Sequence, residues 1–303
     1  MSSNRQLTIL ALSIFLGVVF PQLAALCKPL LLPAIFLLFT FAIFQVRFRD
    51  VYYSVFHHPA SWIILFWQLV FLPLCVSLVL SPWNQTEWYL FAVVAMCTSS
   101  ITATTALAKI FNLNDALALV VCLVGTILMP VPLYIFLNIF VETSVNIDLP
   151  LYVSRILTYI VLPFLLVALV RWLLSVQSEK TIRQQSPVIV LFLLMVFGLS
   201  VMDGVRDLMI EDPQFLLLLV LLAFGLNLSV HLITHFCLRF IGQQDVTTAC
   251  LLCAYRNMGM VAAIAGASLG EYFFIFVGVW QLPMYTLPLI LKKIYQYQPS
   301  TAS

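Results

Sequence analysis

Charge is scarce in this sequence: Asp, Glu, Lys and Arg together make up 9% of its 303 residues. Soluble domains carry such residues at about a quarter of their positions, so the composition excludes an ordinary soluble fold. Hydrophobic residues account for 63% of the chain, and the mean hydropathy is +1.09. We therefore expect an all-α polytopic membrane protein that is surrounded by the lipid bilayer and has no nucleic acid as a partner.

The sequence also lacks a soluble segment, a linker and a low-complexity tract. Its one extended polar stretch, 176–187, is interpreted as a cytoplasmic loop near the middle of the chain. No disulfide framework is indicated, because every cysteine lies in or beside an apolar run and acts there as a small hydrophobe. The C-x-x-C pair of Cys250 and Cys253 has no second pair near it, so we expect no metal or redox centre.

Carboxylates are missing from the middle of the apolar runs. Most acidic side chains lie instead at run ends that we place outside the membrane: Glu87, Glu142, Asp148, Asp203, Asp207, Glu211, Asp212 and Glu271. The chain therefore offers no mid-membrane carboxylate for a proton relay or as a counter-charge to an intramembrane cation.

Ten apolar runs are long enough to cross a hydrocarbon core of about 30 Å, some of them by tilting or breaking. They cover residues 7–22, 27–46, 61–81, 88–110, 115–141, 151–174, 188–203, 214–238, 246–266 and 271–291. The first run is interpreted as a helix and not as a signal peptide, because no clear small-x-small cleavage site follows it.

The cations support this count and give an orientation, since cytoplasmic loops are rich in Lys and Arg. With the N-terminus inside, ten cations fall on the inner side: Arg5, Arg47, Arg49, Lys109, Arg171, Lys180, Arg183, Arg239, Lys292 and Lys293. Three fall outside (Lys28, Arg155 and Arg206), and Arg256 remains within the membrane. We predict a multi-pass protein of the cell (inner) membrane with both termini in the cytoplasm. Asn84 begins an outer glycosylation sequon, which matters only in a eukaryote.

Spans four and five resemble spans nine and ten in their pattern. In each pair a small, polar interruption lies about 28 residues before a helix-breaking proline: Thr102 before Pro130, and Arg256 before Pro283. With five spans in each half, the second copy starts on the opposite side of the membrane, so the sequence predicts two inverted five-helix repeats. The chain divides into helices one to six, the loop, and helices seven to ten: 1–175, 176–187 and 188–303.

Arg256 and Asn257 lie in the middle of an otherwise apolar segment, CLLCAYRNMGMVAAIAG. An intramembrane guanidinium costs roughly 2.5–3.5 kcal/mol even on the lenient insertion scale, so something must compensate it. The small residues around it let backbones approach closely and favour an interrupted helix, which a membrane tolerates only around a protein-lined cavity. We interpret the segment as half of a binding site. The alternative is a structural Arg that pairs with a neighbouring helix end.

The other half is predicted at a cluster of six hydroxyls where span four should break: Thr98, Ser99, Ser100, Thr102, Thr104 and Thr105. Single hydroxyls of this kind usually bond back to their own helical turn. Gln68, five residues before Pro73, lies mid-span and either forms a hydrogen bond to a neighbouring helix or belongs to the site. The residues that we predict to bind substrate or ion are Gln68, Ser99, Ser100, Thr102, Arg256 and Asn257.

At these residues the chain resembles the bile acid:sodium symporter family, over nearly its whole length. The likeness lies in Gln68 with Pro73, in SSITATTALAK followed by DALAL, and in YRNMGM followed by QLPMYTLP. The resemblance implies ten helices in two inverted repeats, with the broken helices four and nine crossed at the site. It also implies a panel domain of helices one, two, six and seven, a core domain of the others, and elevator-like or rocking alternating access for an organic anion.

By the same resemblance, the sodium ligands of the family fall on Gln68, Ile101, Thr102, Ala118, Cys122, Leu252, Cys253, Tyr255 and Arg256. Leu252 stands where sodium-coupled members have an acidic residue, Arg256 where they have a glutamine, and Ala118 and Cys122 where they have hydroxyls. We hypothesise that Arg256 stands in for bound sodium, or contacts an anionic group of the substrate, so that transport is independent of sodium. No other cofactor and no metal site is expected.

The sequence thus favours a secondary active transporter of a small organic anion, either bile-acid-like or a simpler carboxylate or sulfonate, with altered or absent sodium coupling. Alternatives are an arsenite-type efflux permease, a sensor or scaffold that keeps the fold without transport, and a membrane-embedded enzyme. The enzyme would use the i, i+4 pair His231 and His235 with Arg256, but the midplane lacks an acid or nucleophile, so we expect no enzyme. Substrate, coupling ion, direction and oligomeric state do not follow from the sequence.

Overall fold

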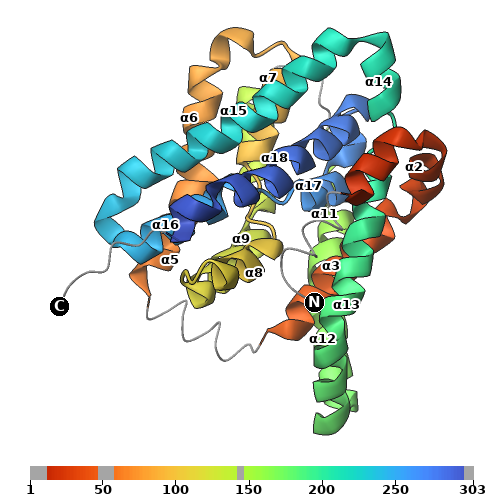
Figure 1. The fold of residues 1–303 in the computed structure, drawn as a ribbon, viewed down its shortest axis with the longest axis vertical. Coiled ribbons are helices and arrows are strands. Elements are labelled where there is room, and N and C mark those ends of the chain that lie inside the picture. Colours follow the sequence, from red (N-terminus) through yellow and green to blue (C-terminus); the bar gives the residue numbers. More distant parts are fainter. Residues whose placement is uncertain (1–11, 47–57, 142–146, 297–303) are drawn as a thin grey trace.

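The computed structural model describes residues 12–46, 58–141 and 147–296, and within these ranges the fold is almost entirely helical, without a strand (Figure 1). Five helical stretches are long and apolar enough to cross a membrane: Pro21–Gln45, Pro59–Val79, Leu149–Leu173, Gln177–Glu211 and Pro213–Ile241. A sixth arises if Asp115–Leu128 and Pro130–Phe140, bent by 54° at their junction, count as one span. The all-helical class that the sequence predicts is confirmed for the described residues, with five or six helices long and apolar enough to span a membrane.

The helices follow one another along the whole described chain. After a helix over 12–19, the first half forms α2 (Pro21–Cys27), η1 (Lys28–Leu30), α3 (Leu31–Gln45), α5 (Pro59–Phe66), η2 (Trp67–Phe71), α6 (Leu72–Val79), η3 (Ser81–Trp83), α7 (Glu87–Met96), α8 (Ala103–Ile110), α9 (Asp115–Leu128) and α10 (Pro130–Phe140). The second half forms α11 (Leu149–Ile156), η4 (Leu157–Val161), α12 (Leu162–Leu173), α13 (Val176–Ser200), α14 (Val205–Glu211), α15 (Pro213–Leu238), η5 (Arg239–Ile241), α16 (Gln243–Ala254), α17 (Met258–Ile264), η6 (Gly266–Ser268) and α18 (Glu271–Gln296). Residues 7–11 of the first predicted run lie outside the described residues.

The predicted loop at 176–187 is wrong in its secondary structure, because these residues form the first turns of α13. Ser175 caps the helix, its side chain accepting from the Ser178 N–H, and Arg183 pairs with Glu179 one turn before it at 3.3 Å. Such caps and i, i+4 ion pairs stabilise a helix that has no apolar face to bury. A polar composition alone was therefore insufficient evidence for a loop.

Two membrane-length helices widen into a π-helical turn just before a proline, at η2 and at η4. In η2 the Leu72 N–H donates to the Trp67 carbonyl, five residues back. Pro73, the next residue, has no N–H to donate. The Gln68 carbonyl is therefore left without a backbone donor from its own helix. Such π-turns are frequent at functional sites.

The helices fall into two groups by their contacts. In the first, α3 packs against α12 and α13, and Figure 1 shows these three alongside one another. In the second, α15 packs against α16 and α18, while α9 packs against α5, α8 and α16. The short α17 contacts members of both groups, among them α3, α11 and α18. It is therefore a principal contact between the two groups.

Polar contacts hold the two ends of the first group together. Before the start of α3, Lys28 pairs with Asp203 at 2.8 Å. At the C-terminal end of α3, Arg171 donates to the carbonyls of Phe44 and Val46. The Arg171 guanidinium also lies 5.5 Å from the centroid of the Phe44 ring. Cations near helix C-termini are favourable because the last carbonyls have no intrahelical donors.

A steric prediction follows from the packing of α18 on the end of α13. A Cβ added at Gly278 would lie 2.2 Å from the Val201 carbonyl oxygen, too close for any side chain. We expect Gly278→Ala to lower the stability by about 1–3 kcal/mol or more, measured as thermal unfolding in detergent. In the matched control Gly225→Ala the new Cβ meets no atom within 4 Å, so stability should hold or rise slightly. Equal melting temperatures for the two variants would contradict this packing.

Candidate functional site

The two predicted helix breaks lie side by side. The chain leaves helical geometry between α7 and α8 and again between α16 and α17, and Ser100 and Arg256 pair as an isolated antiparallel bridge. The Ile101 N–H donates to the Tyr255 carbonyl at 2.9 Å, and the Asn257 N–H donates to the Ser99 carbonyl at 2.8 Å. Each break thus supplies backbone partners to the other, as irregular backbone inside an apolar medium requires.

Short polar side chains explain why the helices end here. The Thr98 hydroxyl donates back to the Ala95 carbonyl at 2.9 Å, and Thr104 donates likewise to the Ile101 carbonyl. These bonds compete with the regular helical pattern. On the other segment Asn257 caps α17, its side-chain oxygen accepting from the Met260 N–H at 3.2 Å.

The Arg256 side chain is fully buried at the crossing, with 0% of its surface exposed. Its Nη1 donates to the Thr98 carbonyl at 2.7 Å and to the Gln68 carbonyl at 3.2 Å. Both oxygens lack other donors for a local reason: Thr98 follows the end of α7, and Gln68 precedes the proline that cannot donate to it. None of the ion pairs among the described residues involves Arg256. The guanidinium is therefore compensated by backbone dipoles.

Around Arg256 lies a set of buried polar side chains, which we call the buried polar cluster: Gln68, Thr98, Ser99, Ser100, Thr126 and Arg256. The Ser100 hydroxyl donates to Gln68 Oε1 at 2.9 Å, and Ser99 and Thr126 share a hydroxyl hydrogen bond of 2.9 Å. Arg256 Nε and Nη2 and Gln68 Nε2 have no hydrogen-bond partner within the described part of the chain. The cluster thus connects span three, span five and both breaks, and three of its nitrogen donors remain without a hydrogen-bond partner.

A cavity of about 480 Å³ lies beside the crossing. Its walls come from the second half of α3, from α8, the first half of α9, the middle of α13, and α18. It reaches from the breaks, at Thr102 and Asn257, to Lys109 and Asp115 beside the loop between α8 and α9. Most of these lining residues belong to the halves that the cation count predicts to be cytoplasmic; Ile35 of α3 and Gly259 and Met260 of α17 do not. The cavity is large enough for a small organic molecule.

The predicted site residues therefore divide into two sets. Gln68, Ser99, Ser100 and Arg256 are fully buried in the cluster and do not line the cavity. Thr102 and Asn257 line it. Arg256 therefore does not reach the cavity wall in this conformation, and its Nη1 donates to two backbone carbonyls instead.

Sequence reasoning missed Thr126 and Lys109, and it named Thr105 only as a member of the hydroxyl cluster and not among the binding residues. Thr126 completes the buried polar cluster, and Thr105 and Lys109 line the cavity together with Thr102. The spacing 102, 105 and 109 places these residues on one face of a helix, which the sequence already contained. The sequence analysis considered only the residues at the two helix breaks and therefore did not consider this face of the helix.

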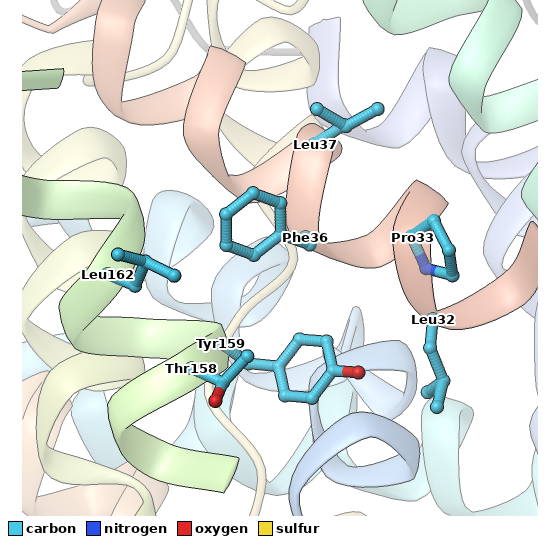
Figure 2. Close-up of a pocket in the computed structure, with 7 residues that line it drawn as sticks. All are labelled: Leu32, Pro33, Phe36, Leu37, Thr158, Tyr159 and Leu162. Atoms are coloured by element: carbon cyan, nitrogen blue, oxygen red, sulfur yellow. The ribbon is translucent and has the colours of Figure 1, made fainter. Parts of the chain in front are cut away.

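Another hollow, of about 430 Å³, lies on the first group of helices (Figure 2). Leu32, Pro33, Phe36 and Leu37 of α3 face η4 and α12 across it. Its walls carry no charged side chain and none of the predicted site residues. It is open and mostly apolar, as a surface facing lipid tails would be.

The two histidines considered as a metal pair have different surroundings. The His231 ring nitrogen lies 3.1 Å from the Asn227 carbonyl, and its ring lies edge-on to Tyr255 at 5.6 Å. His235, one turn later, is exposed. Within the described ranges no three side chains of His, Cys, Asp or Glu gather as metal ligands would.

The fold and the crossing define a helical membrane protein whose two interrupted helices meet at a buried, backbone-bound arginine. No family model matches the chain, and no curated protein matches it.

Removing the guanidinium should expose its role in stability. Arg256→Met keeps an unbranched side chain about as long as the arginine stem but leaves the Gln68 and Thr98 carbonyls buried without a donor, at about 1–3 kcal/mol each. We expect the melting temperature in detergent to fall by several degrees. Arg206→Met is the control, because Arg206 is exposed and makes one bond of 3.3 Å to the Val19 carbonyl. An unchanged melting temperature for Arg256→Met would show that the carbonyl contacts do not stabilise the fold.

Proposed function

We propose that this protein is a secondary transporter that moves a small organic anion by alternating access. The observation that carries the proposal is the pairing of two interrupted helices beside a cavity that extends from the crossing to the loop between α8 and α9. Broken helices that cross within the bilayer, next to a substrate-sized space, are typical of secondary transporters. A cavity that opens toward one side is the form expected of one state in an alternating cycle.

The grouping of helices supports a rocking or elevator-like motion. The first group contains the helices at sequence positions two, six and seven, and the second contains three to five and eight to ten. The proposal includes ten spans in two inverted repeats, with the first group and helix one as panel. Helical segments coincide with all ten predicted runs within the described ranges. The pairs α7–α8 and α16–α17 are interrupted at the crossing, so neither forms one long helix.

Arg256 supports a sodium-independent version of this mechanism. A sodium ion is bound by oxygen ligands, and a carbonyl freed at a helix break is such a ligand. Here the freed carbonyls of Thr98 and Gln68 are already bound by Nη1. Ala118, Cys122 and Leu252 offer no hydroxyl or carboxylate beside them. A permanent cation of the chain thus occupies the place of a dissolved one.

The first test is uptake in proteoliposomes with sodium replaced by choline, over a panel of carboxylates and sulfonates. We expect an unchanged rate of uptake for the transported anion, because the fixed guanidinium does not leave. Arg256→Gln is the companion variant, which removes the charge and should abolish uptake or make it depend on sodium. Strict sodium dependence of the unmodified protein would exclude the fixed-cation mechanism, and absence of uptake for every anion would exclude the transport proposal.

A second test concerns the end of the cavity at which Lys109 and Asp115 are exposed. Thr105→Cys is made in a background in which the partly exposed Cys27 and Cys75, the exposed Cys237 and the cavity-lining Cys122 are serine. We expect a membrane-impermeant thiol reagent to label position 105 from the cytoplasmic side, because the cavity opens there. Leu117→Cys, buried on the neighbouring α9, is the control and should stay unlabelled. Labelling of position 105 from the outer side alone would reverse the predicted orientation.

A further inference from the structure

One face of α8 carries a polar stripe through a mostly apolar cavity. Thr102, Thr105 and Lys109 all line the cavity, and their spacing of three and four residues places them one above another on the helix. The stripe runs from the break at Thr102 toward the loop that follows α8. The opposite walls, from α3 and α13, contribute chiefly Ile, Leu, Val and Phe side chains.

Lys109 is the cation on the wall of this cavity. Its side chain is exposed to the cavity opening, and none of the ion pairs among the described residues includes it. Arg256, by contrast, is fully buried outside the cavity lining and donates to two backbone carbonyls. An anion that enters the cavity therefore meets the ammonium of Lys109 and not the guanidinium.

Asp115 is the acidic residue on the cavity wall, and it forms no ion pair with Lys109. It lies in the first turn of α9, where a carboxylate is stabilised by the unpaired backbone N–H groups of the helix start. No ion pair of 4.0 Å or less joins it to Lys109. The cavity wall therefore carries one positive side chain, Lys109, and one negative side chain, Asp115, which are not paired with each other.

We propose that Lys109 is the residue that selects anionic substrates. The anionic group of the substrate binds the Lys109 ammonium, with the Thr105 hydroxyl as a second donor, while its apolar body lies against α3 and α13. This inference rests on the proposed transport function and assigns the anion contact within it. Arg256 then keeps the crossing intact and has no direct part in choosing the substrate.

The experiment compares two probes of nearly equal shape, naphthalene-1-sulfonate and the uncharged naphthalene-1-sulfonamide, by their binding to purified full-length protein in detergent. The unmodified protein should prefer the sulfonate. Lys109→Gln should weaken sulfonate binding about tenfold and leave sulfonamide binding unchanged, since a charge-assisted hydrogen bond is lost. Lys109→Arg should restore most of the preference. Arg239→Gln, which removes a cation outside the cavity lining, should bind both probes as the unmodified protein does.

The possible results separate the inference from the proposed function. If the unmodified protein prefers the sulfonate and Lys109→Gln keeps that preference, the assignment of Lys109 is wrong while anion transport still stands. If the unmodified protein shows no preference for the sulfonate, and no uptake of any carboxylate or sulfonate, both fail together. An equal loss of both probes in Lys109→Gln also overturns the assignment, because it shows a structural role for the side chain.

Discussion

One buried guanidinium holds the centre of this structure together. Arg256 reaches the Thr98 carbonyl at the end of one helix and the Gln68 carbonyl in the π-turn of another. Each carbonyl would cost about 1–3 kcal/mol if it were left without a donor in an apolar medium, and the guanidinium alone would cost more. The three groups are unfavourable separately and compatible together. The hydrogen bonds from Arg256 to the two carbonyls therefore stabilise the helix interruptions.

The rest of the architecture follows from keeping that crossing rigid. Two backbone hydrogen bonds align the breaks, and Gln68 and Thr126 hold the hydroxyls of Ser100 and Ser99. Small residues let neighbouring helices come close: a Cβ at Gly259 would approach the Phe197 ring to 3.0 Å. The short α17 can therefore contact both groups of helices without a large side chain between them. The cavity is the space that this arrangement leaves on one side.

Much of this could be predicted from the sequence, and the reason is chemical. An arginine in an apolar run and six hydroxyls within eight positions marked both interruptions, because a membrane helix tolerates neither without cause. The partners of Arg256 could not be predicted in the same way. They are backbone oxygens, which every residue has, and a proline in a regular α-helix frees the carbonyl four residues back, so the π-turn that frees the Gln68 carbonyl could not be foreseen.

Two other features could not be predicted from the composition of their segments: the helix over 176–187 and the polar face of α8. The stretch 176–187 looked like a loop because it is polar, yet its cap and its Glu179–Arg183 pair form a helix. The role that we propose for Lys109 could not be derived from the sequence, because its charge was counted only as evidence for the predicted inner side of the membrane. The face it shares with Thr102 and Thr105 becomes evident only when the cavity shows which side of α8 is inward.

A positive charge that belongs to the chain also changes the energetics of a transport cycle. A dissolved ion brings the energy of its own gradient to each turnover, but a tethered guanidinium returns with the protein and contributes no gradient. Each cycle of the proposed carrier then moves only the charge of its substrate. A monovalent anion is favoured outside a cell by about 2.3 kcal/mol for every 100 mV of inside-negative voltage. The membrane voltage alone would thus drive net export, and net entry would require an outside concentration high enough to outweigh this electrical energy.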